Sequence, residues 1–371
     1  MKCSDIEVKW EAYIKGTLSD VEEQQIDQHV EMCEFCTNKL DVVAENEQQL
    51  AMKNPELILK KAKRKHRFKN VTLAIVSGII LYAFLQFSSI TYYATGERST
   101  AVRTTNQVIY QMTHANLFIK PYGYLRYEVD PTFKIDYTSQ PVLKTVGHGE
   151  SYVGNIQLST RLDRLVSLDP SISTSVNSLY FLNRFKPVTV DDESTFQALN
   201  RLPEGTVSEV AVTFKDSLSY EQLFQFAKQY ELEVVWAGIE TFPLAALEEE
   251  YLLVGNNVIG QHELALTQEL LTYAQIVGEN GWPAEQNAQQ SEALFYGSLK
   301  YLEKNDRLAS SILQETTALK IDLKEVLRYI EDNGIRLYGA VITGPTKQML
   351  ALKDDSTVLH VQLGESALWN W

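Results

Sequence analysis

The chain has 371 residues, more than one compact core normally holds, so we expect at least two folded units. Its hydrophobic fraction of 44% and charged fraction of 22% are ordinary for globular proteins and exclude a wholly disordered chain. The formal net charge of -14 argues against nucleic acid as a direct partner. A basic block within residues 55–70 interrupts this acidity and needs its own explanation.

Residues 1–45 are expected to form a small all-α domain. One predicted helix carries Ile6 and ends at Gly16, because glycine suits the left-handed residue that closes a helix. Ser19 with Glu22 three residues later is a capping-box pattern that opens a second helix. A third helix is expected from Cys36 onward.

All three cysteines of the chain lie in this first domain. His29, Cys33 and Cys36 are spaced four and three residues apart, which would place them on one side near the end of the second helix. A hairpin turning at residues 16–19 would return Cys3 to them as a fourth group. Imidazole and thiolate are the ligands that zinc prefers in a tetrahedral shell. The sequence therefore predicts a closed, structural Zn²⁺ site made by Cys3, His29, Cys33 and Cys36.

Two other interpretations of these cysteines stay open. They are unligated thiols kept reduced by the cytoplasm, or they are a redox switch in which adjacent zinc-bound thiolates oxidise to a disulfide and release the metal.

The order Cys3, His29, Cys33, Cys36 resembles the pattern of zinc-binding anti-sigma domains, over residues 1–45. The resemblance implies a domain that wraps around an extracytoplasmic-function sigma factor and blocks its access to RNA polymerase. It also implies that the next helix, within residues 54–67, contributes to binding of the sigma factor.

A membrane span is expected to divide the chain. Residues 71–93, VTLAIVSGIILYAFLQFSSITYY, carry no charge, and a helix of this length rises far enough to cross a hydrocarbon core about 30 Å thick. A buried core helix is usually shorter, and a cleaved signal peptide would lie at the extreme N-terminus. The sequence predicts a single transmembrane helix here.

The preceding segment, residues 46–70, is predicted as a basic juxtamembrane helix containing KKAKRKHRFK. Such a block also occurs as a nucleic-acid patch or a localisation signal, but its position favours a role in topology and in contact with anionic membrane lipid. The positive-inside rule then places the N-terminus in the cytoplasm and the C-terminal part outside the cell membrane.

Residues 94–195 are predicted to form an extracellular β-rich region, from alternating stretches such as LFIKPYGYLRYEV and YVGNIQLSTRL. Within it, GESYVG is similar to the nucleophile turn of serine carboxypeptidases, with Ser151 as nucleophile and His360 as base. That turn requires a strand followed by a helix, whereas the residues around it predict strand, turn and strand. The alternative prediction is that the chain is an envelope enzyme or a ligand-binding protein, whose zinc-binding domain serves only as a cytoplasmic tether.

Residues 196–371 are expected to form an extracellular α+β domain. The stretches TVSEVAVTF, SYEQLFQFAKQY and ELEVVWAGIE predict a first βαβ unit, and IRLYGAVIT, GPTKQMLALKD and VLHVQL predict a second. Helical stretches lie between the two units. This pattern predicts a ferredoxin-like sandwich with a helical insertion. TGPTK lacks the full spacing of a phosphate-binding loop, so a strand-to-helix turn is expected there.

Three separated segments, LPEGTVSEVAVTF, NGIRLYGAVITGPTKQML and the terminal ALWNW, resemble the sigma factor regulator C-terminal domain of Gram-positive anti-sigma proteins. Known members of that family usually lack this cysteine set.

Together these features predict an α+β membrane protein that is an anti-sigma factor and not an enzyme. Its expected partners are an extracytoplasmic-function sigma factor, membrane lipid, and a membrane protease or sensory partner. The signal would cross by regulated cleavage near the span, by a conformational push or through that partner. The sequence does not decide among these three routes.

Overall fold

The computed structural model describes residues 2–53, 55–119, 127–173, 179–188, 190–253, 259–262, 287–317 and 321–369. The chain divides into two compact units, residues 1–81 and residues 82–371, called here the N-terminal and C-terminal units. The segment predicted as QHELALTQELLTYAQIV, and the last two residues of ALWNW, fall largely or wholly outside the described residues.

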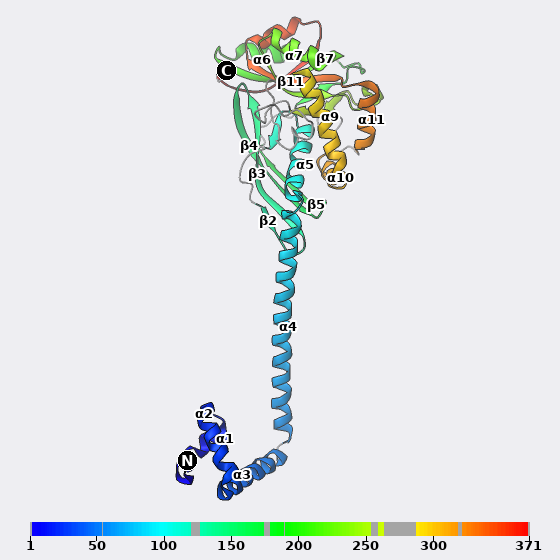
Figure 1. Cartoon of the computed structure of the whole chain (residues 1–371). Coiled ribbons are helices and arrows are strands. Elements are labelled where there is room, and N and C mark those ends of the chain that lie inside the picture. The colour runs from blue at the N-terminus through cyan, green and yellow to red at the C-terminus, as the bar shows by residue number, and fades with distance from the viewer. Residues whose placement is uncertain are drawn as a thin grey trace. The chain divides into compact units, whose positions relative to one another are not determined.

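The helices and strands follow one another in the order shown in Figure 1. They are α1 (Cys3–Lys15), α2 (Asp20–Met32), α3 (Glu34–Lys53), α4 (Pro55–Ala94), α5 (Arg98–Thr113), β1 (Leu117–Ile119), β2 (Tyr127–Val129), β3 (Lys134–Val146), β4 (Gly149–Arg161), β5 (Arg164–Ile172), β6 (Tyr180–Leu182), α6 (Glu193–Arg201), β7 (Thr206–Leu218), α7 (Tyr220–Gln229), β8 (Glu233–Ile239), η1 (Leu244–Ala246), β9 (Tyr251–Leu253), β10 (Ile259–His262), α9 (Ala288–Lys304), α10 (Asp306–Thr316), α11 (Leu323–Asn333), β11 (Leu337–Pro345), η2 (Gln348–Asp354) and β12 (Val358–Leu368).

The N-terminal unit begins with the three predicted helices. Gly16 closes α1 in the left-handed conformation at φ 64°, as predicted. Ser19 does start α2, but the capping box is incomplete, because the Ser19 hydroxyl donates to the Glu22 carboxylate at 2.8 Å instead of accepting from the helix backbone. The small core consists of Ile6, Ile26, Val30 and Cys36. So few buried side chains give this unit little stability of their own.

Helix α4 is continuous over 40 residues and contains the predicted span. Residues 59–94 have a mean hydropathy of 2.0 in their most apolar window, of which only 6% is buried, so this is a candidate membrane-spanning helix. The predicted juxtamembrane segment, residues 46–70, is divided between the end of α3 and the start of α4.

The end of α4 belongs to the C-terminal unit and is fastened to it by hydrogen bonds. Gln86 Nε2 donates to the carbonyl of Val129 at 2.7 Å. The hydroxyl of Tyr93 donates to the carbonyl of Phe133 at 2.8 Å and accepts from the backbone N–H of Leu162 at 3.0 Å. The last two turns of α4 are thus held against the end of β2 and against two turns of the neighbouring sheet.

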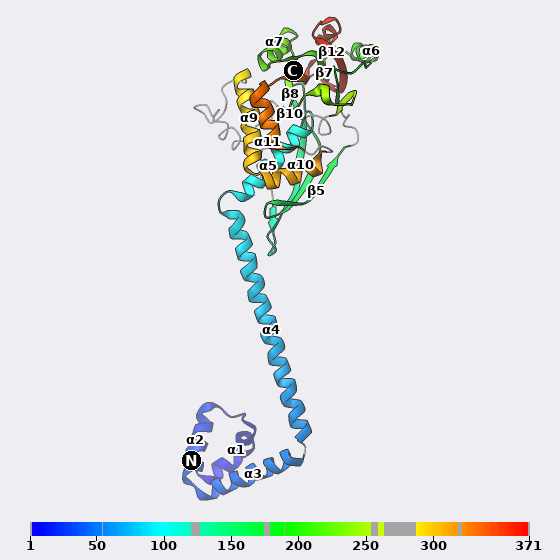
Figure 2. The same ribbon diagram turned by 90° about the vertical axis from the view of Figure 1, so that its right-hand side faces the viewer.

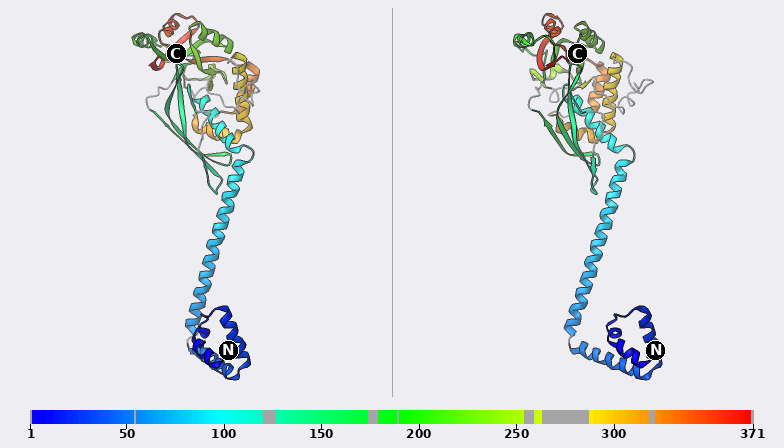
Figure 3. Two further views of the ribbon diagram at one scale, coloured as in Figure 1. Left: turned by 60° about the vertical axis from the view of Figure 1, so that its left-hand side comes forward. Right: turned by 90° about the vertical axis from the view of Figure 1, so that its left-hand side faces the viewer.

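The first sheet of the C-terminal unit runs β1-β3-β4-β5, with β2 also paired to β3, all antiparallel. Figure 3 shows its long strands. The prediction of a β-rich region over residues 94–195 is incomplete, because the helix α5 precedes these strands. Every residue from Thr104 to Thr113 is buried, polar ones included, so α5 lacks the one-sided apolar stripe by which a helix is recognised.

The second sheet has the order β10-β8-β11-β7-β12 and is antiparallel throughout. Strand β11 lies between β7 and β8, and β7 lies between β11 and β12, so the two predicted βαβ units interleave as a ferredoxin-like sheet requires. The second crossover was predicted as a helix over GPTKQMLALKD, which contains Pro345. Pro345 instead ends β11, and the crossover is the seven-residue 3₁₀ helix η2.

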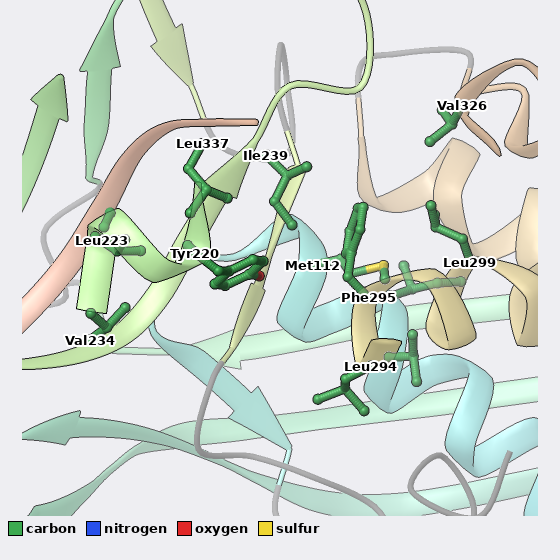
Figure 4. Close-up of a cluster of buried hydrophobic side chains, with 14 of the residues drawn as sticks. Met112, Tyr220, Leu223, Val234, Ile239, Leu294, Phe295, Leu299, Val326 and Leu337 are labelled. Atoms are coloured by element: carbon green, nitrogen blue, oxygen red, sulfur yellow. The ribbon is translucent and has the colours of Figure 1, made fainter. Parts of the chain in front are cut away.

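Helix α7 packs on β7, β8 and β11 of the second sheet, α10 packs on α5 and on β5 of the first sheet, and α9 packs on α7, α10 and α11. Residues of all these elements share the main apolar core. Figure 2 shows α9 and α11, which pack on each other, running side by side. Figure 4 shows Tyr220 from α7, Phe295 from α9 and Met112 from α5 converging in this core. Helix α5 thus contributes to the same core as the second sheet, and residues 82–371 form one unit.

A buried polar network joins the two sheets. Lys144 on β3 forms an ion pair with Glu209 on β7 at 2.6 Å, with side chains 1% and 0% exposed. Asn116 donates through Nδ2 to Glu209 Oε1 at 2.9 Å and to the carbonyl of Thr145 at 2.7 Å. The backbone N–H of Glu365 donates to Glu209 Oε2 at 3.2 Å. Such a pair is retained only when its remaining hydrogen-bonding groups are satisfied, as they are here.

Gln140 on β3 is a buried amide in an apolar neighbourhood. It is 0% exposed, and within the described part of the chain neither its nitrogen nor its oxygen has a hydrogen-bond partner. It pairs in register with Ile156, which packs with Val142 and Tyr110. An unsatisfied buried polar group costs about 1–3 kcal/mol.

We therefore expect Gln140→Met to raise the free energy of unfolding by about 1–2 kcal/mol, since methionine keeps the shape and removes the orphaned atoms. Urea unfolding of the full-length protein in detergent measures this change. Gln157→Met, the same exchange at an exposed position of β4, is the matched control and should be nearly neutral. A destabilised Gln140→Met protein would contradict the assignment.

Candidate metal centre

The helix ends of the N-terminal unit bring the four predicted ligands together. Cys3 is the first residue of α1, and His29 lies in the last turn of α2. Cys36 lies in the first turn of α3. Cys33, predicted within the second helix, instead occupies the extended residue between α2 and α3, at φ −122°. This break turns the chain so that Cys33, between the helices, and Cys36, in the first turn of α3, approach the same point.

The four donor atoms all lie within 4.8 Å of one another. Cys3 Sγ is 3.5 Å from His29 Nε2 and 3.6 Å from Cys33 Sγ. A tetrahedral zinc ion with Zn–S of about 2.3 Å and Zn–N of about 2.0 Å would separate such a nitrogen and sulfur by about 3.5 Å and two sulfurs by about 3.8 Å. The cysteines are free, and 3.6 Å is far beyond the roughly 2.05 Å of a disulfide.

The cluster is half embedded in the core of the unit. Cys36 is 3% exposed and packs with Ile6, Ile26 and Val30, whereas Cys3 is exposed. The hydroxyl of Thr37 donates to the carbonyls of Val30 and Cys33, at 2.5 and 3.1 Å, and so braces the turn that carries the two thiols. Sequence reasoning missed Thr37, although a hydroxyl residue directly after Cys36 is a visible signal.

The two neighbouring thiols differ in acidity in the metal-free protein. The backbone N–H of Cys36 donates to the sulfur of Cys33 and lowers the pKa of Cys33 to about 7. Burial raises the pKa of Cys36 to about 11. At neutral pH the thiol of Cys33 is therefore about half ionised, whereas the thiol of Cys36 keeps its proton until a metal or base removes it.

After removal of metal by chelation, iodoacetamide should alkylate Cys33 tens of times faster than Cys36 at pH 7. The larger thiolate fraction of Cys33 outweighs the lower nucleophilicity that accompanies a lower pKa. The Cys33 rate should rise as pH increases through about 7 and level off above it. Peptide mass spectrometry of each cysteine over a pH series checks this. Equal rates for the two thiols would contradict it.

Ser151 and His360, the two residues of the predicted hydrolase alternative, do not have the surroundings that a nucleophile and its base require. Ser151 lies inside β4 and pairs with Lys144 on β3, in the strand–turn–strand arrangement that was predicted. His360 on β12 bonds through Nδ1 to Asp192 at 2.5 Å and stacks on Tyr180. Ser151 is absent from the contacts of His360 within the described residues, and the strand-to-helix nucleophile turn does not occur at Ser151.

Comparisons with known proteins give the class of the molecule. A family model described as "Sigma factor regulator C-terminal" matches residues 199–365, and one described as "Sigma factor regulator N-terminal" matches residues 56–148. The two matches cover most of the chain, so the protein is an anti-sigma factor that belongs to the sigma factor regulator family. Its role is regulatory, and its partner is a sigma factor. The predicted resemblance of the C-terminal part is thereby confirmed.

One curated relative is similar over its whole length. It is the "Probable anti-sigma-M factor YhdL" of Bacillus subtilis (strain 168), 25% identical over 386 aligned residues that cover 100% of both chains. No solved structure matches the chain at a significant level. Neither family model includes the residues of the candidate metal centre, which all precede residue 56.

Proposed function

We propose that this anti-sigma factor binds an extracytoplasmic-function sigma factor through a zinc-stabilised domain, residues 1–45, on the cytoplasmic face of the cell membrane. In this proposal α4 crosses the membrane and the C-terminal unit lies outside. A signal received outside weakens the hold on the sigma factor, which is then free to bind RNA polymerase.

The observation that supports binding most directly is the apolar surface of the N-terminal unit. Its helices expose Val8 (86%), Val21 (66%), Met32 (85%), Phe35 (68%) and Val42 (56%). Exposed apolar side chains that lie together offer contact area to a partner protein, and Met32 and Phe35 lie on either side of the turn between α2 and α3. Met32 and Phe35 flank Cys33, so a metal that fixes the turn between α2 and α3 also fixes these two side chains.

Zinc is supported by the chemistry of the donors. Three sulfurs and one imidazole nitrogen at these separations suit a closed tetrahedral site, which has a structural role because no coordination position is left for a substrate. Anchoring of ligands on three helices would couple metal binding to folding.

The proposed orientation rests on charge. Seven cationic side chains within residues 60–69 precede the apolar stretch: Lys60, Lys61, Lys63, Arg64, Lys65, Arg67 and Lys69. They favour retention of that flank in the cytoplasm and attract anionic membrane lipid.

The test is co-purification of the full-length protein in detergent with candidate extracytoplasmic-function sigma factors. Met32→Asp with Phe35→Asp should weaken binding by about a hundredfold, because charges replace apolar contact area. Gln25→Asp, a charge added at an exposed polar position of α2, is the control and should bind normally. If none of the sigma factors is retained by the unsubstituted protein, the proposal fails.

A further inference from the structure

A cavity lies at the base of the C-terminal unit, where α4 ends. It has a volume of about 350 Å³. Its walls come from four places: Tyr92 at the end of α4, Arg98 at the start of α5, Asp163 in the turn between β4 and β5, and Lys304 to Leu308 at the junction of α9 and α10. A pocket assembled from four elements is a built feature of the fold rather than a surface groove of one loop.

Position along α4 places this cavity at the level of lipid headgroups when the helix spans a bilayer. Phe84, Phe87 and Ile90 are 65%, 71% and 49% exposed, so one face of α4 stays apolar and open up to Ile90. Tyr92 follows two residues later and lines the cavity. The polar headgroup layer adds several ångströms on each side of a core about 30 Å thick, and tyrosine is enriched there.

The charges around the cavity favour an anion. Three cationic side chains line it, Arg98, Lys304 and Arg307, against two carboxylates. Asp163 pairs with Arg307 at 2.9 Å, so these two charges compensate each other, and Asp306 accepts from the Ser310 hydroxyl at 3.0 Å. The side chains that line the cavity thus carry an excess of one positive charge.

Arg98 is held in place for such a role. It donates through Nη1 to the carbonyl of Tyr92 at 3.0 Å and to Thr95 Oγ1 at 3.2 Å, and its guanidinium lies 4.3 Å from the centre of the Tyr92 ring. Arginine fixed in this way presents its remaining N–H groups in a planar fork that matches phosphate oxygens.

We propose that this cavity binds the phosphate group of an anionic phospholipid headgroup and so seats the base of the C-terminal unit on the membrane surface. The inference rests on the proposed function in one respect, that α4 spans the membrane. It assigns a role to the junction of α9 and α10, which the family comparisons leave unassigned.

The test uses the full-length protein in mild detergent, titrated with short-chain phosphatidylglycerol and followed by native mass spectrometry. A double variant, Lys304→Gln with Arg307→Gln, should bind this lipid about tenfold more weakly, as expected for loss of charge-assisted hydrogen bonds. Arg98 is kept because it also closes the turn after α4. The matched control is Lys324→Gln with Arg328→Gln on the exposed face of α11, which should bind like the unsubstituted protein.

Glycerol phosphate is the second probe. If it competes with the lipid in the unsubstituted protein and not in the double variant, the pocket recognises the phosphate group itself. That result supports the site and shows that a free phosphate compound also fills it. If only the lipid binds, and binds differently in the two proteins, the source is the membrane. The proposal is overturned if the unsubstituted protein and the double variant bind the lipid with equal affinity while the double variant keeps its unfolding midpoint. The basic residues within 60–69 would then account for all lipid binding.

Two further measurements separate this proposal from the proposed function. Sigma-factor binding is followed in the same samples, and insertion is followed by flotation with vesicles. A double variant that keeps both and loses only lipid affinity supports the pocket. A chain that does not float with vesicles refutes the membrane function and removes the basis of the pocket with it.

Discussion

His29→Ala should abolish stoichiometric zinc binding and unfold the N-terminal unit. We expect the zinc content to fall from about one ion per chain to near zero, because only three protein ligands remain for a metal that needs four. The unit has only a handful of core side chains, so its fold depends on the metal. Sigma-factor affinity should fall by about a hundredfold or more, roughly 3 kcal/mol. Metal analysis, far-ultraviolet circular dichroism of residues 1–69 and a binding assay with the full chain measure these effects.

His66→Ala provides the matched control, since His66 is an exposed histidine on α4 outside the cluster. It should keep zinc, helicity and binding. Chelation of the unsubstituted protein should reproduce the His29→Ala result, and return of zinc should reverse it. Full helicity and normal sigma binding in the chelated protein would show that metal has no folding role.

The second large effect is expected at the ion pair between the two sheets. Lys144→Met should destabilise the C-terminal unit by about 3–5 kcal/mol, because it leaves the Glu209 carboxylate buried without its cation. Glu209→Gln should cost less, since the amide still accepts from Asn116 and leaves a lysine near Glu365. Urea unfolding of the full-length protein, followed by tryptophan fluorescence, measures both changes.

Two comparisons make this prediction specific. The double variant Lys144→Met with Glu209→Leu should recover much of the loss, because no unpaired charge remains. Asp163→Asn, which breaks the exposed pair with Arg307, should cost less than about 1 kcal/mol. If the Lys144 and Asp163 variants lose equal stability, the buried pair is not a special contact between the sheets.

The features most readable from sequence depend on local spacing. The grouping of the four candidate ligands follows from residues three and four apart plus one hairpin, the candidate span follows from an uncharged stretch, and β7, α7 and β8 follow from alternating and helical periodicity. Their stabilising contacts lie within or between neighbouring elements, so a single sequence carries the signal.

Other parts could not be predicted because their causes are tertiary. Helix α5 is buried on all sides and rich in threonine, so neither an apolar stripe nor helix propensity marks it. The union of residues 94–195 with the second sheet rests on a shared apolar core and on the pair of Lys144 and Glu209, which are 65 positions apart, and no local pattern pairs these two residues. The extended conformation of Cys33 depends on how two helices meet, which residue spacing does not specify.

The hydroxyl of Tyr93 sets a limit on where the chain can be cut to separate its two units. It binds one turn of the sheet at Phe133 and another at Leu162, and Gln86 adds a third attachment seven residues earlier. A cut between Gln86 and Tyr93 leaves Tyr93 bonded to the sheet on one fragment and Gln86 on the other, where its hydrogen bond to Val129 has to break before the N-terminal unit can leave. A cut before Gln86 separates the two units without breaking any of these three bonds.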